Sequence, residues 1–99
     1  MNTIMLYTKN NCPACDLLKR RLNSKYIEFD IVDVETDEKA FALIVSKGFR
    51  SVPVFQVNND FASGAFLGAP ELRQLLDRAN QIQMARDNDV EMRMPSLGI

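Results

Sequence analysis

The sequence predicts an α/β fold in which helices flank a four-stranded mixed sheet, in the order βαβαββα. A short apolar run at 4–7 precedes a helical pattern that begins at Pro13. An alternating run at 26–34 is followed by a second helical pattern. Two short strand patterns separated by Asn58-Asn59-Asp60 then lead to a final amphipathic helix. The change of period from strand to helix, with a hairpin turn near the end, predicts this order.

Length and composition favour one small domain. The chain has 99 residues, of which 46% are hydrophobic and 25% charged, with a formal net charge of -1. This gives enough apolar material for a single core but no general basic field for nucleic acid. No apolar run reaches the length of a membrane span, and no secretory signal region precedes the first strand. We therefore expect a soluble, cytoplasmic monomer that binds neither nucleic acid nor membranes.

The first strand and helix follow from the residues on either side of a polar loop. Residues 4–7 form the continuous apolar run of a central strand covered on both faces, and residues 8–11 are polar. The helix from Pro13 to Asn23 has one apolar stripe, made of Cys15, Leu18 and Leu22, with Ala14 and Leu17 beside it. The triplet Lys19-Arg20-Arg21 lies largely outside this stripe. It is either a solvated face or a docking patch for an acidic partner.

The second strand and helix are predicted in the middle of the chain. The run at 26–34 alternates as a strand does, and a helical connection makes it parallel to the first strand. Thr36 is the expected N-cap of the second helix, with Asp37 and Glu38 in its first turn. The predicted apolar face consists of Ala40, Phe41, Ile44 and Val45, and the helix ends at Lys47-Gly48.

A hairpin and a last helix complete the predicted fold. Residues 52–57 form strand three, with Pro53 near its start where a missing N–H is tolerated, and residues 61–63 return as strand four. Pro70 suits the first position of the last helix, whose apolar residues are Leu72, Leu75, Leu76 and Ala79. The pattern is lost beyond Asp87. We expect one domain over 1–87 and a flexible tail over 88–99, with partner binding as the alternative role of the tail.

The only two cysteines, Cys12 and Cys15, lie at the predicted start of the first helix. The fixed φ and missing N–H of Pro13 suit the first helical position, which makes Cys12 the expected N-cap. Backbone N–H groups and the helix dipole favour a negative sulfur there, and can lower a Cys-x-x-Cys thiol pKa from about 8.5 to between about 3.5 and 7.5. We expect Cys12 to be the nucleophile and Cys15, one turn further in, to be the resolving thiol.

The element order and four motifs resemble the thioredoxin fold in its minimal glutaredoxin form, over about residues 3 to 80. The motifs are Tyr7-Thr8-Lys9, Cys12-Pro13-Ala14-Cys15, Gly48-Phe49-Arg50-Ser51-Val52-Pro53-Val54-Phe55 and Ser63-Gly64. The resemblance implies a dithiol-disulfide oxidoreductase that reduces protein disulfides and has no bound cofactor. It implies that four residues support the cysteine pair: Tyr7, Lys9, Pro13 and Ala14. It implies substrate contacts from Ser51, Val52, Pro53, Ser63, Gly64 and Ala65, with Pro53 in the cis form facing the cysteines and Val52 pairing with the substrate main chain.

The motifs are also similar to those of NrdH-type redoxins, which are recharged by thioredoxin reductase with NADPH and reduce ribonucleotide reductase. The match is partial, since Ala62 replaces their Trp and Ala65-Phe66-Leu67 replaces their Phe-Arg-Pro. Glutaredoxins that bind glutathione place an Asp where this chain has Leu67, although Lys9 matches a lysine that reaches the glycine carboxylate. Thioredoxin reductase and glutathione therefore both remain candidate electron sources.

Phe61 and Phe66 are candidate docking residues in place of the missing Trp, with core packing as the simpler role for Phe61. A compact redoxin of this kind would also suit a viral genome that must make deoxynucleotides.

Three other classes fit the residues less well. A zinc site normally takes four ligands, whereas this chain has two cysteines and no histidine. An iron–sulfur cluster bridged between two subunits by glutathione is the other metal alternative, but Pro13 resembles variants in which that assembly is disfavoured. A cysteine hydrolase lacks a histidine base. A purely structural disulfide would close too small a loop to constrain the chain much.

Overall fold

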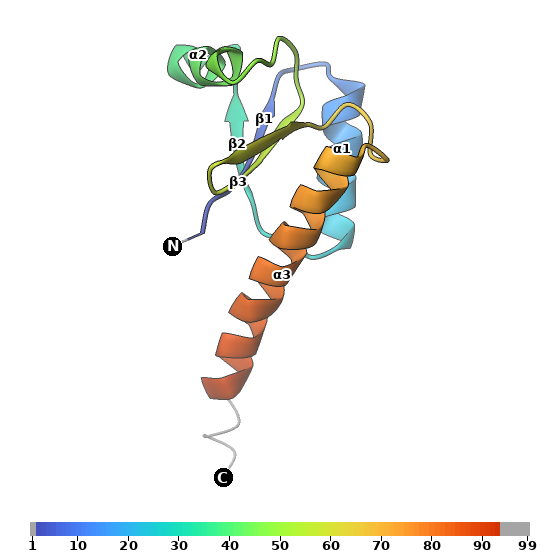
Figure 1. Ribbon diagram of the computed structural model, residues 1–99, viewed down its shortest axis with the longest axis vertical. Helices are drawn as coiled ribbons and strands as arrows, with labels where there is room; N and C mark the ends of the chain where they lie inside the picture. The colour runs from blue at the N-terminus through green and yellow to red at the C-terminus, as the bar shows by residue number, and fades with distance from the viewer. Residues whose placement is uncertain (1, 94–99) are drawn as a thin grey trace.

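The computed structural model describes residues 2–93 and contains one four-stranded sheet with the strand order β2-β1-β3-β4 (Figure 1). The strands are β1 (Ile4–Thr8), β2 (Asp30–Asp33), β3 (Val54–Val57) and β4 (Asp60–Ser63). The helices are α1 (Pro13–Ser24), α2 (Glu38–Ser46) and α3 (Pro70–Arg93). β1 and β2 are parallel, whereas β3 is antiparallel to both β1 and β4. The predicted βαβαββα order, the mixed sheet and the hairpin are confirmed.

Two apolar clusters form the core on opposite faces of the sheet. Successive side chains of a strand point to opposite faces, so Leu6 and Tyr7 of β1 belong to different clusters. The larger cluster packs the sheet against α1 and α3 and includes Leu6, Leu18, Leu22, Phe55 and Leu72, all fully buried. The smaller cluster packs the sheet against α2 and is made of Tyr7, Ala40, Ile44 and Val54. The sheet thus lies between α2 on one face and α1 and α3 on the other. The loop at 9–12, which carries Cys12, follows β1, a central strand of the sheet.

The second strand is shorter than the alternating run at 26–34 predicts. The parallel ladder begins with Met5 opposite Asp30, because β1 itself begins only one residue earlier. Residues before Asp30 have no neighbouring strand to pair with. The N–H of Glu28 instead donates to the side chain of Gln83 in α3, at 2.9 Å.

The predicted N-cap of the second helix is wrong by one position. Asp37, not Thr36, is the N-cap, and its Oδ1 accepts the N–H of Ala40 at 3.0 Å. Two members of the predicted apolar face also remain exposed: Phe41 at 48% and Val45 at 46%. Among the described helices, α2 alone covers its face of the sheet, so only the stripe of Ala40 and Ile44 is buried.

The last helix continues to Arg93, past the end that the sequence predicts near Asp87. The side chain of Gln83 donates to Asp87 Oδ1 at 3.2 Å, an i,i+4 contact that supports the helix beyond Ala79. Glu91, Met92 and Arg93 also have high helix propensity. α3 therefore extends well beyond the sheet (Figure 1). The rest of the predicted tail, 94–99, lies outside the described residues.

Within residues 2–93, no helix combines the length and apolar character that crossing a membrane requires.

Candidate active site

Cys12 is the N-cap of α1, as the sequence predicts. Its backbone is extended, with φ -121° and ψ 96°, and Pro13 occupies the start of the helix. The Sγ atom of Cys12 accepts the N–H of Cys15 at 3.1 Å, and the Cys12 carbonyl accepts the N–H of Asp16 at 3.1 Å. The sulfur thus lies at the positive end of α1, beside a backbone donor that favours negative charge.

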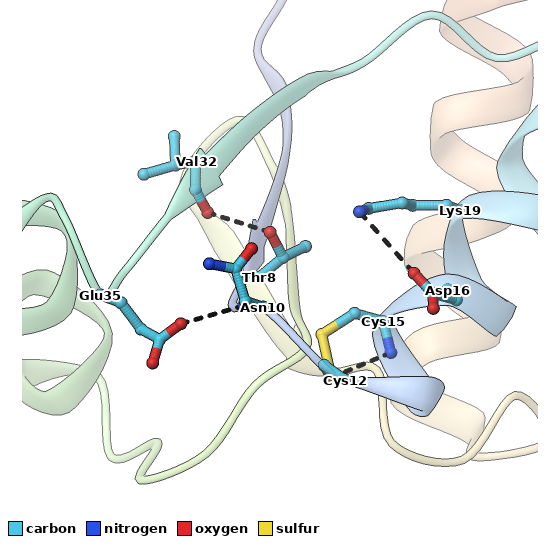
Figure 2. Close-up of polar contacts among 8 residues, drawn as sticks. All are labelled: Thr8, Asn10, Cys12, Cys15, Asp16, Lys19, Val32 and Glu35. Carbon is cyan, nitrogen blue, oxygen red and sulfur yellow. Dashed lines mark hydrogen bonds and ion pairs between the residues drawn. A yellow bond between two sulfur atoms is a disulfide. The ribbon is translucent and has the colours of Figure 1, made fainter.

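A disulfide joins Cys12 and Cys15, whose Cα atoms are 5.2 Å apart (Figure 2). Cys15 is fully buried because it lies on the same helical stripe as Leu18, whereas Cys12 keeps 7% of its surface exposed. The structure therefore represents the oxidised form of the pair. Of the two residues, Cys12 is the one that keeps accessible surface.

The loop that carries Cys12 is fastened to the end of β2. The N–H of Asn10 donates to Glu35 Oε1 at 3.0 Å, and the Thr8 hydroxyl lies 3.5 Å from the carbonyl of Val32 (Figure 2). These contacts arise because parallel strands β1 and β2 end at the same edge of the sheet. Sequence patterns alone do not single out Glu35. Its place directly after a strand parallel to β1 is the signal that identifies it.

The peptide bond between Val52 and Pro53 is cis, as the family resemblance implies. The N–H of Gly64 donates to the carbonyl of the buried Pro53 at 2.8 Å. A Cβ atom on Gly64 would lie 2.5 Å from Leu18 Cδ2 and 3.1 Å from Pro53 Cγ. Gly64 therefore lies close to both Pro53 and Leu18 of α1, and a side chain at this position would displace one of them.

A cavity of about 320 Å³ collects three of the predicted site residues, Lys9, Ser51 and Val52. Its other lining residues are Val34, Glu35, Phe41, Ile44 and Arg50. Glu35 lines this cavity and also accepts the N–H of Asn10 in the loop before Cys12. It is mainly apolar, but two cations and one carboxylate also line it. This composition suits a peptide segment or a small molecule that bears a carboxylate.

Ser63 and Ala65 follow the hairpin strand β4 and do not line this cavity. Ser63 is paired with Val54 across the hairpin, and its hydroxyl accepts the N–H of Ala65 at 3.3 Å. A separate cavity of about 260 Å³ is lined by Phe49, Phe61, Ala62, Ser63, Phe66, Ala69 and Glu71. Phe66 is 78% exposed, whereas Phe61 packs against the α2-side cluster. Ser51 and Val52 thus line one cavity and Ser63 another, whereas Pro53, Gly64 and Ala65 line neither.

Tyr7 belongs to the core on the α2 side of the sheet. Its buried hydroxyl donates to Gln56 Oε1 at 2.6 Å, and Gln56 Nε2 donates to the carbonyl of Asn58 at 2.6 Å. Burial raises the pKa of Tyr7 above its ordinary value of 10.0, and the negative charge of Asp37 acts in the same direction. This arrangement gives Tyr7 a packing role in the strand that leads to the cysteines. Ala14 is half-buried in the first turn of α1.

Among the side chains of residues 2–88, no three cysteine, aspartate or glutamate side chains gather where they could hold one metal ion.

Comparison with known proteins identifies similar chains. The glutaredoxin family model matches residues 4–62. The glutaredoxin-like protein NrdH of Lactococcus lactis subsp. lactis is 32% identical over 63 residues, which are 64% of this chain and 86% of the relative. NrdH of Salmonella typhimurium is 36% identical over 62 residues, or 63% and 76% of the two chains. N-acetyl-S-hydroxy-L-cysteine reductase of Bacillus subtilis is 30% identical over 86 residues, or 84% and 92%.

The solved structure of NrdH-redoxin from Escherichia coli superposes with a TM-score of 0.64 at 25% identity, covering 77% of this chain and 92% of that one. The two chains therefore share the thioredoxin-like fold, with its four-stranded mixed sheet and three helices.

Proposed function

The chain belongs to the glutaredoxin family of thiol-disulfide oxidoreductases, and from this premise we propose that it reduces protein disulfides with Cys12 as the attacking thiol and Cys15 as the resolving thiol. The observation that carries the proposal is the position of the two sulfurs. Cys12 caps α1 and accepts a backbone N–H, while Cys15 is fully buried within bonding reach of it. A buried thiol cannot meet a large substrate first, so Cys15 acts second.

The exchange proceeds in two steps and passes through a mixed disulfide between Cys12 and the substrate. In the reduced protein, the N–H of Cys15 and the end of the helix stabilise the Cys12 thiolate. This thiolate attacks one sulfur of the substrate disulfide, the substrate S–S bond breaks, and the other substrate sulfur leaves as a thiolate. Cys15 then loses its proton and attacks the Cys12 sulfur, the bond between Cys12 and the substrate breaks, and the second substrate sulfur leaves as a thiolate that takes up a proton. The Cys12–Cys15 disulfide forms, and two electrons have passed to the substrate.

We propose that thioredoxin reductase with NADPH supplies the electrons. We propose that ribonucleotide reductase is the target. The similarity to relatives named NrdH supports both assignments. Leu67 supports the first, because this apolar side chain is half-buried against the larger core cluster and offers no charge to the amine of glutathione. We also propose that the protein acts as a monomer in the reducing cytoplasm and needs no prosthetic group.

A second candidate is the reduction of a small oxidised thiol that bears a carboxylate. The cavity of about 320 Å³ has the size of a small-molecule site, and Lys9 and Arg50 line it together with Val52. Glutathione mixed disulfides fall in this class, and so does the substrate in the name of the Bacillus subtilis relative. Two cations suit such a carboxylate.

The deciding experiment compares two ways of recharging the oxidised protein during reduction of a disulfide-bonded ribonucleotide reductase. One mixture contains NADPH and thioredoxin reductase, and the other contains glutathione, glutathione reductase and NADPH. We expect NADPH consumption to be at least about tenfold faster in the first mixture, and the reverse order would support the second candidate. Cys12→Ser should abolish activity, whereas Cys15→Ser should trap a mixed disulfide that mass spectrometry detects. Full activity of Cys12→Ser would contradict the assigned roles.

A further inference from the structure

A basic cavity of about 170 Å³ lies between α1 and α3, which run side by side on one face of the sheet (Figure 1). Its lining residues are Arg21, Lys25, Leu67, Arg73, Leu76 and Asp77. Three of them are cations and one is an anion, although the whole chain carries a formal net charge of -1. Positive charge is thus concentrated at this cavity.

The cations of the cavity form no ion pair with any side chain of residues 2–88. The ion pairs among these described side chains join Lys19 to Asp16 at 3.9 Å and Arg78 to Asp60 at 2.6 Å. Neither pair includes a cation of the cavity. The three cations are therefore available to a ligand from outside the chain.

The stability of the two helices explains only part of this cluster. Arg21 lies in the last turn of α1 and Lys25 is its C-cap, where cations offset the negative end of the helix dipole. Arg73 instead lies at the N-terminal end of its helix. Its N–H donates to the carbonyl of Ala69 at 2.9 Å, so it lies in the first turn of α3, where a cation is unfavourable. An anion bound between the helices would offset that cost.

We propose that this cavity binds an acidic segment of the protein whose disulfide is reduced at Cys12, an inference that rests on the proposed function. Arg21 lies nine positions after Cys12, or about 13 Å along the axis of α1. About four residues of extended chain span that distance. Leu67 and Leu76 also line the cavity and provide apolar contact for the stems of glutamate side chains. The cavity acts as a second point of attachment that selects substrates by charge and raises their rate of encounter.

The test uses synthetic peptides in which one cysteine forms a mixed disulfide with thionitrobenzoate. Four Gly/Ser residues separate the cysteine from a tail of four glutamates, and a matched peptide carries four glutamines. The pre-reduced protein releases thionitrobenzoate, which is followed by absorbance. We expect the glutamate peptide to react at least about threefold faster at low ionic strength. The advantage should vanish near 1 M salt, where the Debye length falls to about 3 Å.

The double variant Arg21→Gln/Arg73→Gln should lose this advantage and keep the rate with the glutamine peptide. The matched control, Arg20→Gln/Lys39→Gln, removes the same charge from exposed positions outside the cavity and should keep the advantage.

Equal rates for the two peptides with wild-type protein would overturn the inference and leave the proposed function intact. Failure to reduce either peptide would instead count against the proposed function. An equal loss in the control variant would overturn the assigned location. Competition by inorganic phosphate, but not by chloride at equal ionic strength, would overturn the acidic segment in favour of a phosphate ligand.

Discussion

Glu35 accepts the backbone N–H of Asn10 at 3.0 Å and so ties the loop before Cys12 to the end of the neighbouring parallel strand. The two residues are 25 positions apart in the chain, and the contact is exposed. It holds the loop from one side, while the cap of α1 holds it from the other. The geometry of the cysteine pair therefore depends on a side chain outside the Cys-x-x-Cys motif.

Removing this carboxylate should loosen the loop. We expect Glu35→Ala to accelerate hydrogen exchange at the Asn10 amide and to lower the disulfide reduction rate by about two- to tenfold, while the free energy of unfolding falls by no more than about 1.5 kcal/mol. Glu35→Gln keeps an acceptor oxygen and should preserve slow exchange. NMR exchange rates and the reductase assay provide the measurements. Unchanged exchange in Glu35→Ala would show that the contact does not hold the loop.

Gly64 should tolerate no side chain. We expect Gly64→Ala to lower the free energy of unfolding by about 1–3 kcal/mol, because its Cβ would overlap Leu18 and crowd Pro53. Gly68→Ala is the matched control, since a Cβ at Gly68 meets no atom within 4 Å. Its unfolding free energy should stay within about 0.5 kcal/mol of wild type in urea denaturation. Equal stability of the two variants would contradict the close packing of Gly64 against Leu18 and Pro53.

The cap of α2 offers a test between adjacent residues. Asp37→Ala should lower the free energy of unfolding by about 1 kcal/mol, because the N–H of Ala40 loses its acceptor. Thr36→Ala should cost no more than about 0.5 kcal/mol, since Thr36 does not cap the helix. Thermal or urea denaturation measures both. A larger loss in Thr36→Ala would restore the cap that the sequence alone predicts.

Tyr7 should make stability fall in alkaline solution. Its pKa is raised in the folded protein, so the unfolded chain releases the proton first as the pH rises past about 10. The folded state then binds more protons than the unfolded state, and the contribution of Tyr7 is lost between its ordinary pKa and its raised one. In a Tyr26→Phe background, tyrosinate absorbance reports Tyr7 alone, because the chain has two tyrosines and no tryptophan. A Tyr7 titration midpoint at or below 10 would contradict this account.

Much of the fold and the cysteine pair could be predicted because they depend on neighbours in the chain. Pro13 prepares the start of α1, and the helical period places Cys15 on the buried stripe with Leu18. The alternation and turn chemistry around Asn58 likewise predict the hairpin of β3 and β4. Each of these features depends on residues that are close together in the sequence.

The sequence by itself determined the order of elements and the position of Cys12 at a helix end, because both follow from local backbone preferences and short-range periodicity. Only the tertiary structure decided where β2 begins, that Glu35 meets Asn10, and that Arg21 and Arg73 share one cavity. These features join residues far apart in the chain. Their geometry is set by which strands and helices become neighbours, and no local pattern carries that information.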